Sequence, residues 1–468
     1  MFDFFKKKSF LNWFILAAST AVSSLISFLI FIFIGRKMSN DGYGQFNVIT
    51  SLATTFATVI NNIACGTVLN REIATHPFKC RDYIKKSFVI RVSSFIIGAI
   101  SIAIYCSFKY SYSTLICLLT ALFLSYDVFY EFFEQFAFGF KTVKFSSIIN
   151  ISSSIVLLLV FVFIPNNLCT IESVLIIYTS IYICKCVAYL LLDLSNFRKS
   201  EPGESTAFSK IVKDSLPYLW LRVVGILGTQ LPVLLLADFS ELSQVSFYSV
   251  GNKFTLPMTI LVNTAISAFF PYFSQFYKTD KEKYGKYLYF MLFVGIQASS
   301  LFAVLLSSTC ELWLPLIMTE KYNDAVYPFK IQVWYTCVLC VDLVVSMAFS
   351  SSFKQNALAI ITTIDVAVLL PVLFLTIEYG AVGVAIGKAS CAAVCLLYHI
   401  AIFMKLIPPK KFQIVFILTE LLIMVGLMLV TIVFGEALII ILAAAFALAL
   451  DFLIDIPYFR TLKEIRHG

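Results

Sequence analysis

Charged residues are scarce in this sequence of 468 amino acids. Asp, Glu, Lys and Arg together make up 13% of the chain, whereas hydrophobic residues make up 60%, and an ordinary soluble protein carries about 25% charged residues. The mean hydropathy is +0.90, and apolar runs of about 20 residues recur along the chain. No segment is long or polar enough for a separate soluble domain. The sequence therefore predicts an all-α, polytopic membrane protein.

The residues and motifs of common catalytic and metal sites are also few. The three histidines, His76, His399 and His467, make no metal-ligand pattern, and Cys337 and Cys340 form a CxxC pair inside an apolar run with no second pair. There is no P-loop, GxGxxG, HExxH or GxSxG motif. We therefore expect no enzyme activity, no cofactor and no metal. Transport, if that is the function, is not powered by ATP within this chain.

Apolar runs bounded by polar turns predict fourteen transmembrane helices. The first run follows Lys6, Lys7 and Lys8 and is too long for the apolar region of a signal peptide, which has about 7–15 residues. We therefore interpret it as a retained span. The predicted spans are roughly 10–34, 44–67, 88–106, 114–136, 145–164, 171–192, 216–238, 246–270, 287–308, 329–350, 357–376, 381–404, 412–434 and 437–456.

Basic residues exceed acidic ones, with a formal net charge of +8. In a soluble protein this excess would favour nucleic acid as a partner, but cytoplasmic loops of membrane proteins collect Lys and Arg for topological reasons alone. With the N-terminus inside, 25 of the 35 Lys and Arg fall on the inner side and 4 on the outer side. This asymmetry predicts two cytoplasmic termini and no nucleic-acid partner.

A polar segment divides the predicted spans into six and eight. Residues 194–214 form this cytoplasmic linker, which contains Pro, Gly and several Ser residues. We expect residues 1–193 to form an N-terminal six-helix bundle and residues 215–404 a C-terminal six-helix bundle. An extra helix pair and a cytoplasmic tail would follow in residues 405–468.

The two halves also carry a weak internal repeat. Residues 44–72 align with residues 246–274 at a constant offset of 202, which places Asn61 over Asn263. Both segments are the second span of their half. Because an even number of helices separates them, they would be parallel repeats related by an axis along the membrane normal.

Two cations lie deep in the first pair of spans of the second half. Arg222 and Lys253 each occupy an apolar run that is interrupted by Pro and Gly. Ionisable side chains inside a membrane are costly unless they are paired or line a wet site. We therefore predict that Arg222 and Lys253 bind an anionic substrate.

Three further cations in predicted spans are weaker candidates for substrate binding. Lys185 lies near the middle of the sixth span and Lys388 two turns into the twelfth. Lys388 follows Gly383 and Gly387, whose GxxxG spacing is more often a sign of tight helix packing. Arg91 lies near a span end, where a long side chain can extend to the membrane surface instead.

Acidic residues in the spans could neutralise these cations or carry an ion. Asp127, Glu131 and Glu134 recur at i, i+4 and i+7, so they share one face of the fourth predicted helix and could form static pairs with the cations. Asp342 and Asp365 lie deeper, in the tenth and eleventh spans. We predict that these two are sites of ion or proton coupling.

Four stretches resemble a known group of transporters, and their order and spacing follow the chain from the first span to the twelfth. They are GRKMSNDGYGQFNVI (Gly35–Ile49), FFEQFAFGFKTVKFSSIINI (Phe132–Ile151), VSFYSVGNKFTLPMTIL (Val245–Leu261) and YGAVGVAIGKAS (Tyr379–Ser390). Together they resemble the Wzx-type O-antigen flippases, in the polysaccharide-transport branch of the multidrug/oligosaccharidyl-lipid/polysaccharide (MOP) superfamily. The resemblance implies a MATE-like fold of two pseudo-symmetric six-helix bundles with an added C-terminal helix pair.

The resemblance also implies a function. Such flippases move an undecaprenyl-pyrophosphate-linked glycan from the inner to the outer leaflet of the bacterial plasma (inner) membrane, in lipopolysaccharide biosynthesis and polysaccharide export. The implied partners are this glycan, membrane lipids, a polysaccharide polymerase and a chain-length regulator. No invariant signature of the family fixes the cationic positions, so the choice of Arg222 and Lys253 depends on their depth and kinked context.

Two other functions stay open at this point. A MATE-like, cation-coupled drug antiporter would favour twelve spans and an acidic cavity. An integral membrane glycan polymerase or glycosyltransferase would usually need a large outer loop with catalytic residues. The longest predicted outer loop, residues 308–328, is short and carries few charges.

Overall fold

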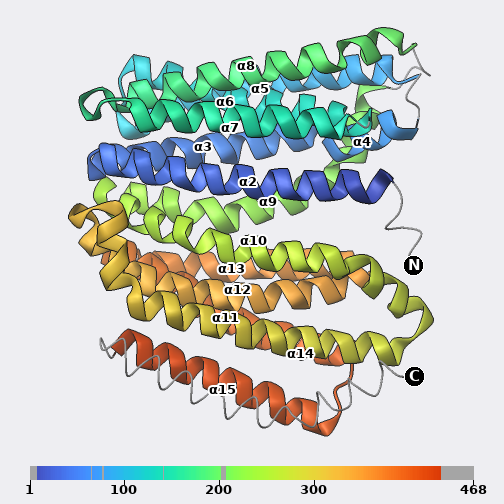
Figure 1. The fold of residues 1–468 in the computed structure, drawn as a ribbon, viewed down its shortest axis with the longest axis vertical. Coiled ribbons are helices and arrows are strands. Elements are labelled where there is room, and N and C mark those ends of the chain that lie inside the picture. The colour runs from blue at the N-terminus through green and yellow to red at the C-terminus, as the bar shows by residue number, and fades with distance from the viewer. Residues whose placement is uncertain (1–7, 65, 76–78, 141, 202–206, 434–468) are drawn as a thin grey trace. The chain divides into compact units, whose positions relative to one another are not determined.

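A computed structural model of the chain describes residues 8–64, 66–75, 79–140, 142–201 and 207–433. Secondary structure in these described residues is helical, and they contain no strand (Figure 1). The chain divides into two compact units, residues 1–246 and 247–468.

The first unit consists of long helices that lie side by side (Figure 1). Helix α2 packs against α7, α6 packs against α8, and α3 packs against α9, α6 and α5. Its helices are α2 (Lys8–Lys37), α3 (Asn40–Ile63), α4 (Gly66–Thr75), α5 (Arg81–Tyr110), α6 (Thr114–Gly139), α7 (Val143–Phe163), the short η1 (Asn166–Leu168), α8 (Ile171–Lys199) and α9 (Phe208–Phe239).

The second unit is built around α12, which packs against α11 and α14, while α13 packs against α14. Helix α10 begins at the end of the first unit and continues into the second. The helices are α10 (Leu242–Thr279), α11 (Lys281–Met318), η2 (Glu320–Ala325), α12 (Val326–Ser351), α13 (Gln355–Thr376), η3 (Ile377–Tyr379), α14 (Gly380–Leu406) and α15 (Lys411–Val433).

The predicted all-α, multi-span architecture is confirmed. Each of the first thirteen predicted spans coincides with a long helix among the described residues. By length and composition, ten helical stretches there could cross a membrane, or eleven if the bent pair α3 and α4 counts as one span. The stretch Asn356–Leu406 counts once although it contains both α13 and α14. The last predicted span, 437–456, lies outside the described residues, so a total of fourteen stays a prediction.

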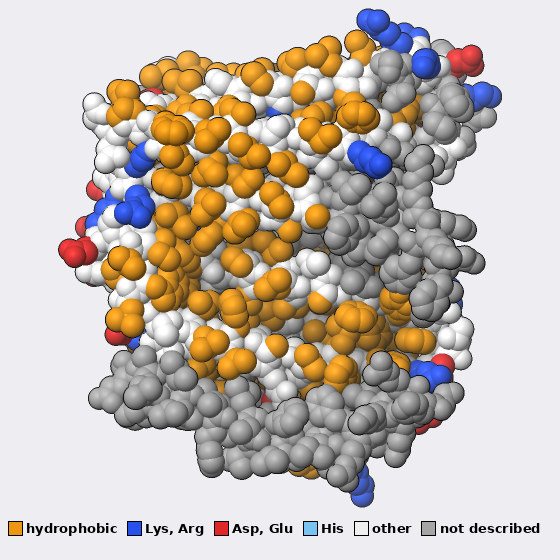
Figure 2. All heavy atoms as spheres, viewed as in Figure 1, with side chains coloured by type: hydrophobic (Ala, Val, Ile, Leu, Met, Phe, Trp, Pro, Cys, Tyr) orange, Lys and Arg blue, Asp and Glu red, His pale blue; other side chains and the backbone are white. Residues whose placement is uncertain are grey.

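Hydrophobic side chains cover the helices on the face drawn in Figure 2, and the visible Lys and Arg side chains lie mostly toward the helix ends. Many large apolar side chains are exposed along the spans, including Phe108, Leu191 and Leu375. A soluble protein would bury such residues, whereas a bilayer solvates them. The surface therefore agrees with the membrane environment that the sequence predicts.

Helix α9 belongs by its contacts to the first unit, where it packs against α3 and α5. Gly44 in α3 lies against the backbone carbonyl of Leu242, in the same unit. Only glycine allows this close approach, because a Cβ at Gly44 would overlap that oxygen. The predicted division into bundles of residues 1–193 and 215–404, joined by the linker 194–214, stays a prediction.

Lys37, at the end of α2, caps the C-terminal end of α7. Its ammonium group donates hydrogen bonds to the carbonyl oxygens of Phe161, Val162 and Ile164 at 2.8, 2.8 and 2.7 Å. The last carbonyls of a helix have no partner within the helix, and a cation is favourable at this end of the helix dipole. Lys37 therefore fastens α2 to α7.

We expect Lys37→Met to lower the stability of the solubilised protein by about 2 kcal/mol, because three carbonyl oxygens lose a charged donor. The midpoint of unfolding in mixed detergent and SDS micelles measures this change. Lys213→Met removes an exposed lysine of α9 and serves as the control, with little expected effect. Equal midpoints for the two variants would exclude the capping role of Lys37.

Candidate functional site

Arg91 in α5 is completely buried, and it forms hydrogen bonds with the backbone of two other helices. Its guanidinium group donates to the carbonyl oxygens of Asn61 and Ala64, each at 2.8 Å, and of Val128 at 3.2 Å. It also pairs with the carboxylate of Glu131 at 3.3 Å. These contacts are those of a structural cross-link between α3, α5 and α6. Its predicted role in substrate binding stays a prediction.

The cross-link lies at a break between α3 and α4, where the chain bends by 40°. Arg91 meets carbonyls at the C-terminal end of α3. A Cβ added to Gly66, the first residue of α4, would lie 3.0 Å from a carboxylate oxygen of Glu131. A cation thus faces one helix end and an anion the other, which is the favourable arrangement for both dipoles.

Lys185 in α8 is a second buried cation, 7% exposed. Its ammonium nitrogen lies 3.7 Å from the ring centroid of Tyr130 and 5.4 Å from that of Tyr182, a cation–π arrangement. The negative carboxylates of Glu134 and Asp127 on α6 attract this ammonium group electrostatically. The acidic face predicted for the fourth helix therefore lies near the buried cations of the first unit.

Glu134 extends this cluster into a hydrogen-bond network. Its carboxylate accepts hydrogen bonds from the Tyr130 hydroxyl and, at 3.2 Å, from the Asn150 amide. The Tyr189 hydroxyl donates to the Asn150 side-chain oxygen at 3.1 Å and lies 2.7 Å from the Ser146 hydroxyl. The network joins α6, α7 and α8 through polar side chains that lie within the predicted membrane spans.

The five predicted substrate-binding cations fall into two groups. Arg222 in α9 and Lys253 in α10 are exposed, whereas Arg91, Lys185 and Lys388 are buried. The Lys388 ammonium lies 4.5 Å from the ring centroid of Tyr335. The structure therefore brings Arg91 and Lys185 to the acidic face of α6, and it places Lys388 in other surroundings.

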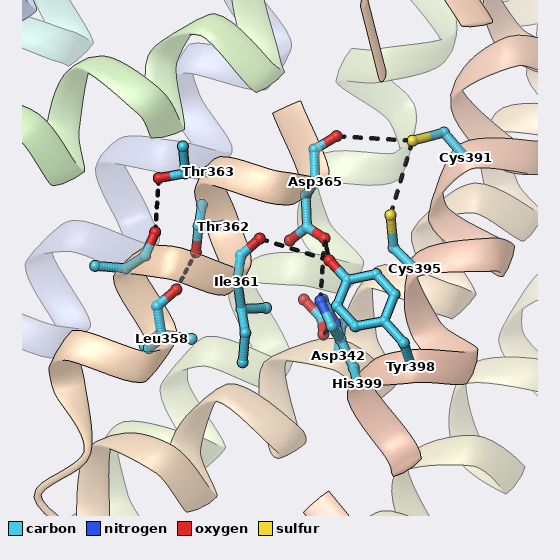
Figure 3. A network of polar contacts seen from close by, with 11 residues as sticks. Asp342, Leu358, Ile361, Thr362, Thr363, Asp365, Cys391, Cys395, Tyr398 and His399 are labelled. Atoms are coloured by element: carbon cyan, nitrogen blue, oxygen red, sulfur yellow. Dashed lines mark hydrogen bonds and ion pairs between the residues drawn. The ribbon is translucent and has the colours of Figure 1, made fainter. Parts of the chain in front are cut away.

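The two predicted coupling residues of the second unit meet at one histidine (Figure 3). The Nε2 atom of His399 in α14 lies 3.0 Å from a carboxylate oxygen of Asp365 in α13. Its Nδ1 atom contacts a carboxylate oxygen of Asp342 in α12. The Tyr398 hydroxyl donates to the same oxygen of Asp365. The side chain of His399 is 5% exposed, against 25% and 26% for the two aspartates.

His399 was not among the residues predicted from the sequence. The histidines make no metal-ligand pattern, and the described residues contain no group of His, Cys, Asp and Glu that could hold a metal ion. The signal that was available is simpler. His399 is an ionisable residue inside an apolar span, which is the criterion that selected the lysines and arginines.

A protein-family model described as "polysaccharide biosynthesis protein" matches residues 9–277 of the chain. The chain belongs to this family. No curated protein sequence matches it significantly. The match agrees with the resemblance to polysaccharide flippases found in the sequence.

Solved structures of three transporters share the fold. The lipid II flippase MurJ in an inward closed conformation has 13% sequence identity and a TM-score of 0.67, over 96% of this chain and 99% of that chain. An inward-facing multidrug resistance MATE family transporter of the MOP superfamily has 11% identity and a TM-score of 0.65, over 82% and 95%. A MOP superfamily transporter from Pyrococcus furiosus has 12% identity and a TM-score of 0.54, over 84% and 94%.

These likenesses confirm the MOP-type fold that the sequence predicts. At identities of 11–13% they concern the fold alone. The family match and the shared fold together identify this polysaccharide biosynthesis protein as a multi-pass membrane protein with the MOP-type fold.

Proposed function

We propose that this family member flips an undecaprenyl-pyrophosphate-linked oligosaccharide, an O-antigen or related surface polysaccharide unit, from the cytoplasmic to the outer leaflet of the bacterial plasma membrane. The observation that carries the proposal is the polysaccharide-family match over residues 9–277, on a fold shared with a lipid II flippase. MATE transporters share the fold as well, but the family model that matches is the one for polysaccharide biosynthesis.

The physical task of such a flippase is to carry a charged head group across a bilayer. The polyprenyl tail can stay in lipid, so the protein needs to enclose only the pyrophosphate and the sugars. Rocking of two halves around a central site would expose the head group to each side in turn. A membrane potential that is negative inside favours outward movement of an anion by about 2.3 kcal/mol per charge per 100 mV.

We assign the contacts with pyrophosphate first to Arg222 and Lys253. Both side chains are exposed, so they can reach a ligand with the helices in their present positions. Arg and Lys form charge-assisted hydrogen bonds with phosphate oxygens. The buried cations Arg91, Lys185 and Lys388 would reach a head group only after the helices rearrange, so we place them second.

Orientation and partners complete the proposal. The distribution of Lys and Arg favours two cytoplasmic termini in the inner membrane. A polysaccharide polymerase and a chain-length regulator would act on the flipped product. Asp342 and Asp365 would couple transport to an ion, and their meeting at His399 supports a shared role.

The test is export of surface glycan in a strain that lacks its own flippase. We expect Arg222→Ala and Lys253→Ala to reduce export about tenfold or more, because each removes a charged hydrogen bond worth about 1.5–3 kcal/mol. Lys278→Ala, at an exposed lysine at the end of α10, is the control and should export normally. Wild-type surface glycan in both site variants, at normal expression, would refute the cationic site.

A further inference from the structure

The Asp342–His399–Asp365 triad contains more acceptors than a neutral histidine can serve. Both ring nitrogens of His399 face a carboxylate oxygen, and a carboxylate can only accept hydrogen bonds. A neutral imidazole carries a proton on one nitrogen, so it could satisfy one of these contacts. One additional proton in the triad would make both contacts hydrogen bonds.

We infer that His399 holds the coupling proton of this transporter, with Asp342 and Asp365 as its two fixed acceptors. The inference rests on the proposed transport function and deepens it, because it names the coupling ion and the residue that carries it. The additional proton adds one positive charge between two carboxylates. Its departure leaves two carboxylates at one imidazole, with one hydrogen bond fewer.

Among the described groups around His399, only the two aspartates of the triad contact its ring as acids. Helix α14 packs against α12, α13 and η3. The titratable groups near the triad are Asp342 and Tyr335 on α12, Asp365 on α13, and Tyr398, Cys395 and Cys391 on α14, and Lys388 on α14 lies against Tyr335. The Cys391 thiol contacts the backbone oxygen of Asp365, at 3.9 Å (Figure 3). The two carboxylates are thus the acidic groups in direct contact with the ring.

A sodium ion fits this arrangement poorly. Hard cations prefer several oxygen ligands, whereas one oxygen of each aspartate already contacts the imidazole ring that lies between Asp342 and Asp365. The remaining carboxylate oxygens beside a positively charged ring would make a poor sodium site, whereas a proton is accommodated with the ring in place.

The proton also connects three helices. The loaded triad joins α12, α13 and α14 through one side chain. Once the proton leaves, one carboxylate loses its hydrogen bond to the imidazole, and the two negative charges repel each other without a cation between them. Helix α13 contains Pro371, which removes a backbone hydrogen bond and makes bending easier. Proton binding at His399 can therefore bias how these helices pack, which is the differential interaction that coupling requires.

The protonation state can be measured directly by nitrogen-15 NMR of histidine-labelled protein in lipid nanodiscs. The chain has three histidines, so the loss of one signal in His399→Gln assigns the residue. At neutral pH we expect both ring nitrogens of His399 to be protonated in the wild-type protein. Only one should be protonated in Asp342→Asn. Replacing choline by sodium at constant ionic strength should leave the wild-type spectrum unchanged.

A neutral His399 in the wild type, or loss of a ring proton on sodium addition, would overturn the inference. Because the measurement needs no substrate, it also separates this inference from the proposed function. A protonated His399 in a protein that exports no glycan would count against the flippase proposal. A neutral His399 in a protein that exports normally would count against the proton site alone.

A second experiment distinguishes a proton carrier from a static cross-link. His399→Arg supplies a permanent cation between the two carboxylates, because a guanidinium group keeps its proton in proteins, so it mimics the loaded state without releasing a proton. We expect this variant to keep its unfolding midpoint and to lose glycan export. If arginine destabilises the fold, His399→Gln, which cannot carry a proton, repeats the test and should also lose export. Normal export by either variant would show that proton exchange at this position is unnecessary.

Discussion

Arg91→Leu is expected to cost about 3–5 kcal/mol of stability, the largest effect of any single substitution proposed for this protein. The change leaves Glu131 without the cation that pairs with it and leaves carbonyl oxygens of Asn61, Ala64 and Val128 without this donor. In a low-dielectric interior each loss is costly. Reduced yield and a lowered midpoint of SDS unfolding would report it.

The matched control for Arg91→Leu lies on the same helix. Lys86 forms an i, i+4 pair with Asp82 at 2.9 Å, and both side chains are partly exposed. Lys86→Leu should therefore cost no more than about 0.5 kcal/mol. The double variant Arg91→Leu/Glu131→Leu should recover part of the loss, because no unpaired charge remains. If the double variant loses as much stability as Arg91→Leu and Glu131→Leu lose together, this account is contradicted.

Gly383→Ala is expected to have the next largest effect, a loss of about 1–3 kcal/mol from overpacking. A Cβ at Gly383 in α14 would overlap the backbone carbonyl oxygen of Thr376, at the end of α13. At Gly387 it would meet the Thr376 hydroxyl. Backbone cannot move aside as a side chain can, so the two helices would have to separate. The same unfolding assay measures the loss.

Gly426→Ala provides the control, because it makes the same change in α15 where no atom of the described residues lies within 4 Å of the added Cβ. Alanine is favoured over glycine within a helix by about 0.5–1 kcal/mol, so this variant should be unchanged or slightly more stable. The contrast tests packing directly. If both alanine variants behave alike, the close contact between α14 and Thr376 does not contribute to stability.

The fold was largely predictable because its signals are local. A run of about 20 apolar residues identifies a span without knowledge of its neighbours, and thirteen predicted spans coincide with helices. The GxxxG pattern at Gly383 and Gly387 also indicated close packing, and both glycines approach Thr376. Which helices pack against one another has no such local signal. For that reason the contacts of α9 with α3 and α5 were not apparent from the sequence.

The site was predictable only in part, because its contacts join residues far apart in the chain. Helical periodicity places Glu131 and Glu134 on one face of α6, but it does not tell which cation each one meets. Asp342 and Asp365 were recognised as acids deep within predicted spans, yet the residue that joins them, His399, is 57 and 34 positions away. Distance from a span end was an unreliable guide for Arg91, whose exposure depends on tertiary packing.

The position of the Arg91–Glu131 pair also bears on how the chain enters the membrane. Helices α5 and α6 are consecutive, joined by the short segment Ser111–Ser113, and they pack against each other. Inserting a lone arginine at the centre of a helix costs about 2.5–3.5 kcal/mol on insertion scales. Because its counter-charge arrives with the very next span, the two can be cancelled within one helical hairpin during synthesis. The charge of the completely buried Arg91 can thus be neutralised before any later span is inserted.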